Sequence, residues 1–278
     1  MKRFLAWALV LPFVLYNLTF VIFPLFTVLY QSMFTIDAEY NVSHQASLAN
    51  FKTAFSAANL EVMWRSARYA LTTTAACLLL GYPLAYYIAV HGGRFRSQLL
   101  ILVVLPFWTS YLIRTFAWTT LLQKEGVINA ILLKLQLVSE PLQMLNTGFS
   151  VILGLTYGFL PFATLPIYVS LESQDRSLVE AASDLGATPF QAFWKVVFPL
   201  SLPGVISASL ITFVPAMGDF VSAEILGSPE TQMIGNLIQQ QFLALFNWPM
   251  GSALSLVLML LMVTSMAIYM MLAGERDA

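Results

Sequence analysis

Few side chains in this 278-residue sequence could perform covalent or metal chemistry. The single cysteine, Cys77, lies inside an apolar run, so neither a disulfide framework nor a thiolate metal site can form from it. The two histidines, His44 and His91, belong to no grouping that would pair a nucleophile with a base. No lysine follows a glycine, so the phosphate-binding loop G-x4-G-K-[ST] is absent. We therefore expect no metal site, and no ATP hydrolysis by that route.

Charged groups within or beside apolar stretches are the remaining candidates, because a charge at membrane depth needs a partner or water. Arg114 is the one basic residue well inside such a stretch. Our first interpretation is a structural ion pair, and the alternative is that Arg114 positions an acid of this or a partner chain. Asp219 and Glu224 directly follow another apolar stretch, so we expect them either to line a cavity or to act as loop or cap carboxylates.

Membrane-spanning helices must position these residues. With 59% hydrophobic and 10% charged residues, the chain carries more apolar surface than one water-soluble core can bury. A spanning helix needs about 20 mostly apolar residues. The sequence predicts an all-α integral membrane protein with one transmembrane domain over residues 1–278. Its six spans are expected at about 5–30, 69–90, 99–122, 147–171, 198–218 and 251–273.

The distribution of charge predicts the orientation. The short link 91–97 carries Arg94 and Arg96 without an acid, which favours a cytoplasmic location for this link. With six spans, both termini are then cytoplasmic, and segments 35–68 and 123–146 lie outside, where we expect short amphipathic helices. The net charge of −1 and the absence of a basic patch argue against nucleic acid as a partner.

The longest inner connection, residues 172–198, encodes a helix, a turn and a second helix. Ser177 followed three residues later by Glu180 predicts a capping box at the first helix start. Gly186 is expected to adopt the left-handed conformation that ends this helix. The second helix start is predicted by Thr188, Pro189 and Gln191.

The first helix of this loop presents a narrow apolar face of mostly small residues. Its members are spaced at i, i+3, i+4 and i+7, and they are Leu178, Ala181, Ala182 and Leu185. Such a face suits insertion into a groove on another protein. It would equally suit packing beneath the chain's own helical bundle, and the residues by themselves leave both interpretations open.

Glu180, Ala181 and Ala182, with Gly186 four residues later and the run Val-Val-Phe-Pro at 196–199, resemble the E-A-A-x3-G-x9-I-x-L-P signature of ABC importer permeases. Val and Phe replace Ile and Leu, and both replacements are apolar. The resemblance implies a type I permease fold in which a coupling helix docks on an ATPase subunit. It assigns that contact to Glu180, Ala181, Ala182, Leu185 and Gly186.

The same resemblance implies the surroundings of the chain. Members of this family reside in the bacterial inner membrane, and six spans supply half of their usual bundle. We therefore expect a second permease subunit, together with two ATPase subunits and an external substrate-binding protein. The resemblance favours a different chain as the second permease. ATP and Mg²⁺ would be bound by the ATPase partner, and this chain would need no cofactor.

The resemblance extends over most of the chain and is strongest with permeases of spermidine and putrescine importers. It is carried by residues 105–110, 113–114, 215–220, 234–236 and 247–249, beside the loop signature. A polyamine site needs spaced carboxylates and aromatic faces that attract ammonium groups. The candidates are Asp219, Glu224, Trp108, Tyr111 and Tyr157, although each aromatic residue would also suit packing or interface anchoring. Another small amino compound or an opine-like solute is the alternative cargo.

Two other classes of protein remain as rivals. A secondary transporter or channel predicts paired acids or histidines within spans and an inverted repeat, and the sequence shows neither. A membrane enzyme would need the nucleophile or metal cluster that is missing. Co-purification with an ATPase would separate these classes from an ABC permease.

Overall fold

A computed structural model describes residues 2–36, 42–43 and 45–274, and these fall into two compact units. The first unit comprises residues 1–63 and 237–267, and the second comprises residues 64–236 and 268–278. His44 lies outside the described residues, whereas His91 is the last residue of helix α4 (Ala57–His91).

Five helices of the described chain are long and apolar enough to cross a membrane. They are Val10–Ser32, Ala57–His91, Gly148–Glu172, Pro189–Gly218 and Trp248–Met271. A sixth candidate is a broken pair, Gly93–Trp108 and Tyr111–Lys134, which is bent by 87°. The described chain therefore has six spans only if this bent pair counts as one.

The predicted third span, 99–122, is not one straight helix. The chain passes from α5 (Arg96–Val104) into a tight 3-10 turn, η3 (Leu105–Trp108), and is extended at Thr109 before α6 (Tyr111–Leu122) begins. Pro106 lies in this turn and has no N–H to donate to a carbonyl of the preceding helical turn. The uniform apolar composition of this stretch conceals the break, because both arms of the bend are equally apolar.

The first unit contains one long interrupted helix and a small hairpin. Its elements are α1 (Lys2–Asn17), the π turn η1 (Leu18–Ile22), α2 (Phe23–Ser32), β1 (Thr35–Ile36), β2 (Val42–Ser43), α3 (Ala49–Ala54), the start of α4, the π turn η6 (Gln240–Ala244) and most of α14 (Trp248–Gly274). The strands are antiparallel, with Thr35 opposite Ser43. The Asn50 amide donates to the carbonyl oxygens of Ser32 and Phe34 at 3.3 and 2.5 Å, which ties α3 to the end of α2.

The second unit contains the remaining helices. After the rest of α4 come η2 (Gly93–Phe95), α5, η3, α6, α7 (Val127–Lys134), α8 (Gly148–Glu172), α9 (Ser177–Asp184), α10 (Pro189–Ala192), the π turn η4 (Phe193–Val197), α11 (Phe198–Gly218), α12 (Val221–Leu226), η5 (Pro229–Thr231) and the start of α13 (Ile234–Gln239). Helix α7 confirms that segment 123–146 contains a short helix. Pro189–Gly218 is helical throughout, so the second helix of the 172–198 loop runs directly into the fifth span.

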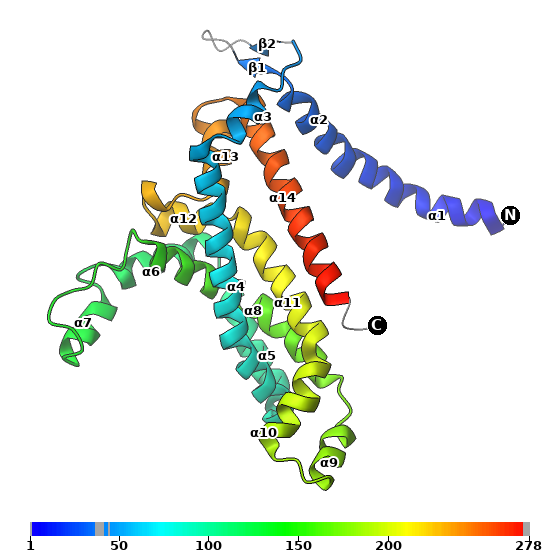
Figure 1. The fold of residues 1–278 in the computed structure, drawn as a ribbon, viewed down its shortest axis with the longest axis vertical. Helices are drawn as coiled ribbons and strands as arrows, with labels where there is room; N and C mark the ends of the chain where they lie inside the picture. Colours follow the sequence, from blue (N-terminus) through cyan, green and yellow to red (C-terminus); the bar gives the residue numbers. More distant parts are fainter. Residues whose placement is uncertain (1, 37–41, 44, 275–278) are drawn as a thin grey trace. The chain divides into compact units, whose positions relative to one another are not determined.

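Helices α8 and α11 lie side by side and form the centre of the second unit (Figure 1). Gly204 permits this approach, since a Cβ atom placed there would lie 2.4 Å from the Ser170 Cβ and 2.8 Å from the Pro166 oxygen. Small residues at a contact between membrane helices allow their backbones to come close.

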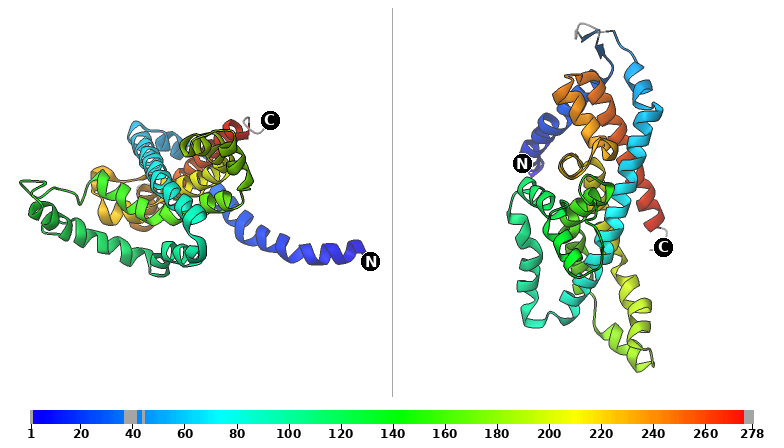
Figure 2. Two further views of the ribbon diagram at one scale, coloured as in Figure 1. Left: turned by 90° about the horizontal axis from the view of Figure 1, so that it is seen from below. Right: turned by 90° about the vertical axis from the view of Figure 1, so that its left-hand side faces the viewer.

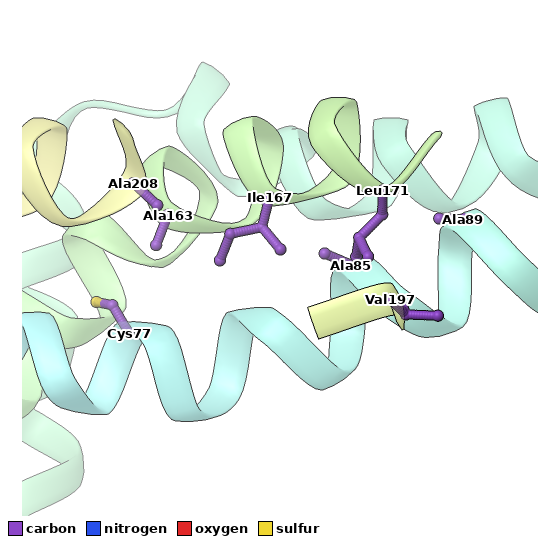
Figure 3. Packing of buried hydrophobic residues seen from close by; sticks show 8 residues of the cluster. All are labelled: Cys77, Ala85, Ala89, Ala163, Ile167, Leu171, Val197 and Ala208. Atoms are coloured by element: carbon purple, nitrogen blue, oxygen red, sulfur yellow. The ribbon is translucent and has the colours of Figure 1, made fainter. Parts of the chain in front are cut away.

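A buried cluster joins α4 to this pair of helices (Figure 3). Its members are mostly small or β-branched, namely Cys77, Ala85, Ala89, Ala163, Ile167, Leu171, Val197 and Ala208. The Cys77 thiol donates to the Thr156 carbonyl oxygen at 3.4 Å, so this cysteine is a buried packing residue. Helices α9 and α10 lie at one end of the second unit, and α12 with α6 lies toward the other (Figures 1 and 2).

Candidate functional site

The hairpin formed by α9 and α10 begins differently from the sequence prediction. The capping box expected between Ser177 and Glu180 is wrong, because α9 already begins at Ser177 and Arg176 is its N-cap residue. The free N–H of Ser177 instead donates to Asp175 Oδ1 at 2.9 Å. This hydrogen bond stabilises the charged carboxylate and lowers the pKa of Asp175.

The structure confirms the predicted glycine turn and the predicted start of the second helix. Gly186 has φ +85°, and the N–H of Ala187 donates to the Ala182 carbonyl oxygen at 3.0 Å, as in a helix ended by a left-handed glycine. The Thr188 N–H donates to Gln191 Oε1 at 3.0 Å, and the Gln191 N–H donates to Thr188 Oγ1 at 3.3 Å. This reciprocal pair is the second predicted capping box.

The apolar residues of α9 are divided between contact with the protein and exposure to its surroundings. Val179 packs against the buried cluster, and Ala182 is half-buried. Glu180, Ala181 and Leu178 are exposed, and Leu185 is 89% exposed at the tip of the hairpin. The exposed side chains of Phe190 and Trp194 continue this surface onto the second helix. The hairpin therefore presents apolar side chains outward.

Arginine contacts hold the base of the hairpin to neighbouring helices of the second unit. Arg96 forms an ion pair with Glu172 at the end of α8 and donates to the Ala89 carbonyl oxygen at 2.8 Å. Arg176 donates to the same oxygen at 3.3 Å. Gln174 donates to the Val197 carbonyl oxygen at 3.1 Å. These contacts join the base of the hairpin to the ends of α4 and α8 and to η4, which directly precedes α11.

A cavity of about 250 Å³ lies behind the hairpin. Its walls include the ends of α4 and α8, the half-buried Val179 and the Glu180 side chain. Glu180 therefore borders this cavity at the back of α9, whereas Leu185 is not among the lining residues. The two sides of α9 thus have different surroundings.

A second polar site lies at the break between α11 and α12. The Tyr111 hydroxyl donates to Asp219 Oδ2 at 3.0 Å and lies 2.6 Å from the Ser222 hydroxyl. Asp219 Oδ1 accepts the Ser222 N–H at 2.7 Å, so Asp219 also caps the start of α12. The structure thereby brings together Tyr111 and Asp219, two residues that the sequence singled out separately.

Glu224 lies one helical turn further along α12. It accepts a hydrogen bond from the Asn236 amide at 3.0 Å, and that amide also donates to the Phe220 carbonyl oxygen at 3.0 Å. Asn236 is fully buried. In the described part of the chain, neither Glu224 nor Asp219 forms an ion pair. Both carboxylates are thus bound by neutral donors.

Arg114 does not form the expected ion pair with any described residue. Its guanidinium lies instead over the rings of three aromatic residues, with distances from Cζ to the ring centroids of 4.2 Å for Phe107, 5.7 Å for Tyr111 and 5.9 Å for Tyr157. Aromatic faces attract a cation and take the place of a carboxylate here. Tyr157 also packs edge to face on Trp118 at 5.5 Å.

Trp108 and Glu224 are the sequence candidates that the structure separates from this cluster. Trp108 ends the η3 turn with 79% of its surface exposed, and among the described residues it takes no part in the ring and cation contacts of Tyr111, Tyr157 and Arg114. Glu224 contacts Asn236 instead. Sequence reasoning missed Phe107, Ser222 and Asn236 as individual site residues. Two of them lie in segments 105–110 and 234–236 that carried the family resemblance, but Ser222 had no such signal.

Comparison with known proteins defines the class. Residues 81–275 match the family of binding-protein-dependent transport system inner membrane components, and the chain belongs to that family. It is therefore an ABC importer permease subunit, a multi-pass inner membrane protein and not an enzyme, and it carries no cofactor.

Individual relatives within this family carry more specific names. The chain is 40% identical to the spermidine/putrescine transport system permease PotB of Haemophilus influenzae, covering 90% of this chain and 87% of that protein. Identity to PotB of Escherichia coli K12 is 37%, covering 90% and 91%. The inner membrane ABC transporter permease YdcU of Escherichia coli K12 is 35% identical, covering 91% and 85%.

Solved structures share the fold. A bacterial ABC transporter that imports the acidic polysaccharide alginate matches with a TM-score of 0.72 at 19% identity, covering 99% of this chain and 96% of that one. The MetNI methionine transporter in an inward-facing conformation matches with a TM-score of 0.54 at 19% identity, covering 78% and 93%. At these identities the likeness concerns the fold alone.

Proposed function

We propose that this chain forms half of the translocation path of an importer for polyamines of the spermidine and putrescine class. The names of two relatives at 37–40% identity support this cargo. The structural observation that supports it is Asp219, a carboxylate whose hydrogen-bond donors among the described residues are neutral and which lies beside an aromatic ring. A carboxylate in this setting attracts a cationic ligand through charge-assisted hydrogen bonds.

The polar site contains the kinds of side chain that would bind a flexible polycation. Asp219 directly precedes α12 and Glu224 lies within it, and their carboxylates would bind separate ammonium groups. Tyr111, which donates to Asp219, and Tyr157, which lies with Tyr111 against Arg114, would supply aromatic faces. Trp108, which is exposed at the η3 turn, would contact the cargo before it reaches this site. These five residues form the proposed substrate path.

Energy would enter through the hairpin. In this proposal α9 is the coupling helix, and Glu180, Ala181, Ala182, Leu185 and Gly186 form its contact with an ATPase subunit. The exposed leucine at the tip supports this role, because an apolar side chain left in water is a typical anchor for a partner groove. Two such ATPase subunits would bind ATP and Mg²⁺, and their closure would tilt the helices between inward-open and outward-open arrangements.

The complete machine in this proposal contains four kinds of chain. This permease would pair with a second permease that is a different chain, and the pair would bind two ATPase subunits. An external binding protein would deliver the cargo. Both termini and the α9–α10 hairpin would face the cytoplasm, in keeping with Arg94 and Arg96 in the short link after α4.

The test is uptake by the reconstituted complex. Radiolabelled spermidine should accumulate in proteoliposomes only with ATP, and unlabelled putrescine should compete where a neutral amino acid does not. Asp219→Asn should lower uptake at least tenfold, whereas Glu140→Gln, which changes an exposed carboxylate in the loop after α7, should leave it unchanged. Uptake of another amino compound with no polyamine transport would refute the proposed cargo, and uptake without ATP would refute the class of mechanism.

A further inference from the structure

The side chain of Arg114 occupies an aromatic cage. Phe107 from the η3 turn, Tyr111 from the first turn of α6 and Tyr157 from α8 surround its guanidinium, with ring centroids 4.2–5.9 Å from Cζ. Gly158 helps to hold this geometry, because a Cβ atom there would lie 3.0 Å from Tyr111 Cε2. Aromatic cages are also used by proteins to bind quaternary ammonium ligands.

The guanidinium of Arg114 has buried nitrogen donors that lack a hydrogen-bond acceptor in the described part of the chain. Its Nε and Nη1 atoms are buried, and neither has a hydrogen-bond partner among the described residues. An arginine kept only for structure would be expected to use these donors, since a buried donor without an acceptor is costly. An acid is connected to the cage, because the Tyr111 hydroxyl donates to Asp219, yet Arg114 and Asp219 form no ion pair.

One residue, Tyr111, therefore contacts both charges of this site, the Arg114 guanidinium and the Asp219 carboxylate. Tyr111 presents its ring to the arginine and its hydroxyl to the carboxylate. A cationic ligand that approaches Asp219 must come close to the same ring and to the positive charge of Arg114. Like charges that come close together in a site of low dielectric repel each other appreciably.

We propose that Arg114 is a resident cation that competes with the ammonium group of the cargo for this cage and so limits how tightly the path retains it. The inference rests on the proposed polyamine function. An importer must release its cargo after each cycle, and a carboxylate lined by aromatic rings would hold a polycation strongly. The arginine occupies the aromatic faces between cycles and repels the cargo when both are present.

The charge of Arg114, not its shape, is the property that matters in this mechanism. Neutral replacements should therefore tighten binding, and a lysine should preserve the wild-type behaviour. The measurement is equilibrium binding of radiolabelled spermidine to the purified nucleotide-free complex of both permeases and the ATPase, without the external binding protein. Arg114→Gln and Arg114→Met should each bind spermidine at least tenfold more tightly than the wild type, with a lower maximal uptake rate.

Two controls separate this role from a structural one. Arg114→Lys should stay within threefold of the wild-type affinity. Arg68→Gln removes an exposed arginine that lies 5.9 Å from the Tyr69 ring, outside the cage, and should change nothing. A merely structural Arg114 would lower the yield of assembled complex without raising its affinity for a cation.

The outcomes are distinct. Unchanged or weaker spermidine binding by both neutral variants, in a complex whose wild type transports spermidine, would overturn the inference and leave the polyamine proposal intact. Failure of both neutral variants to assemble, with normal assembly of Arg114→Lys, would show that the charge supports the fold and would also overturn it. A wild-type complex that neither binds nor transports polyamines would refute both proposals together.

Discussion

Replacement of Leu185 by alanine offers a direct test of the proposed docking role of the hairpin. The side chain is 89% exposed in this chain, so its removal should change the stability of the permease by no more than about 0.5 kcal/mol. If the side chain is buried on docking, the lost carbons correspond to about 2 kcal/mol of apolar transfer free energy. The ATPase subunit should therefore bind about 30-fold more weakly.

The assay compares affinity with stability in the same samples. Permease complexes in nanodiscs are titrated with purified ATPase subunit, and thermal unfolding of the permease is measured in parallel. Leu137→Ala provides the matched control, because Leu137 is also strongly exposed, at 66%, but lies in the loop after α7. The control should bind the ATPase as the wild type does.

An affinity of Leu185→Ala within twofold of the wild type would show that the tip leucine stays in water in the assembled transporter. A large loss of thermal stability would show instead that Leu185 supports the fold of its own chain, contrary to its exposure.

Three further predictions concern the turn, the base of the hairpin and the helix contact above it. Gly186→Val places a β-branched residue at φ +85° and should destabilise the tip by about 1–2 kcal/mol, seen as faster proteolysis of the loop and reduced uptake. Glu172→Gln removes the partly exposed ion pair with Arg96, so stability should fall by less than about 1 kcal/mol while uptake per ATP hydrolysed declines. Gly204→Leu would force a side chain into Ser170 and should cost about 1–3 kcal/mol, measured by thermal unfolding in detergent.

The sequence predicted the hairpin well because its determinants are local. The left-handed conformation of Gly186 and the capping box of Thr188 with Gln191 depend on residues within a few positions of each other. The failed box at Ser177 is a boundary error of one residue, since Asp175 offered an equally good acceptor and the helix began earlier. Local patterns thus give the elements and leave their ends uncertain.

The polar site was predictable only as a set of candidates. Tyr111 and Asp219 are separated by 108 positions, and no periodic pattern indicates that their side chains meet. The break before α6 was hidden because hydropathy records composition and not direction. The aromatic surroundings of Arg114 were missed for another reason. A lone charge in an apolar stretch predicts a need for a partner but does not indicate the chemical type of that partner.

Helices α8 and α11 connect the two sites, and this suggests how a movement at one could affect the other. Helix α8 ends at Glu172, which pairs with Arg96 at the base of the hairpin, and it carries Tyr157 beside Arg114 along its length. Helix α11 continues from the second helix of the hairpin and ends directly before Asp219. The two helices approach closely at Gly204, where a Cβ atom would lie 2.4 Å from the Ser170 Cβ. We therefore expect a displacement of the hairpin to move Tyr157 and Asp219 together, because tightly packed helices transmit strain as a body.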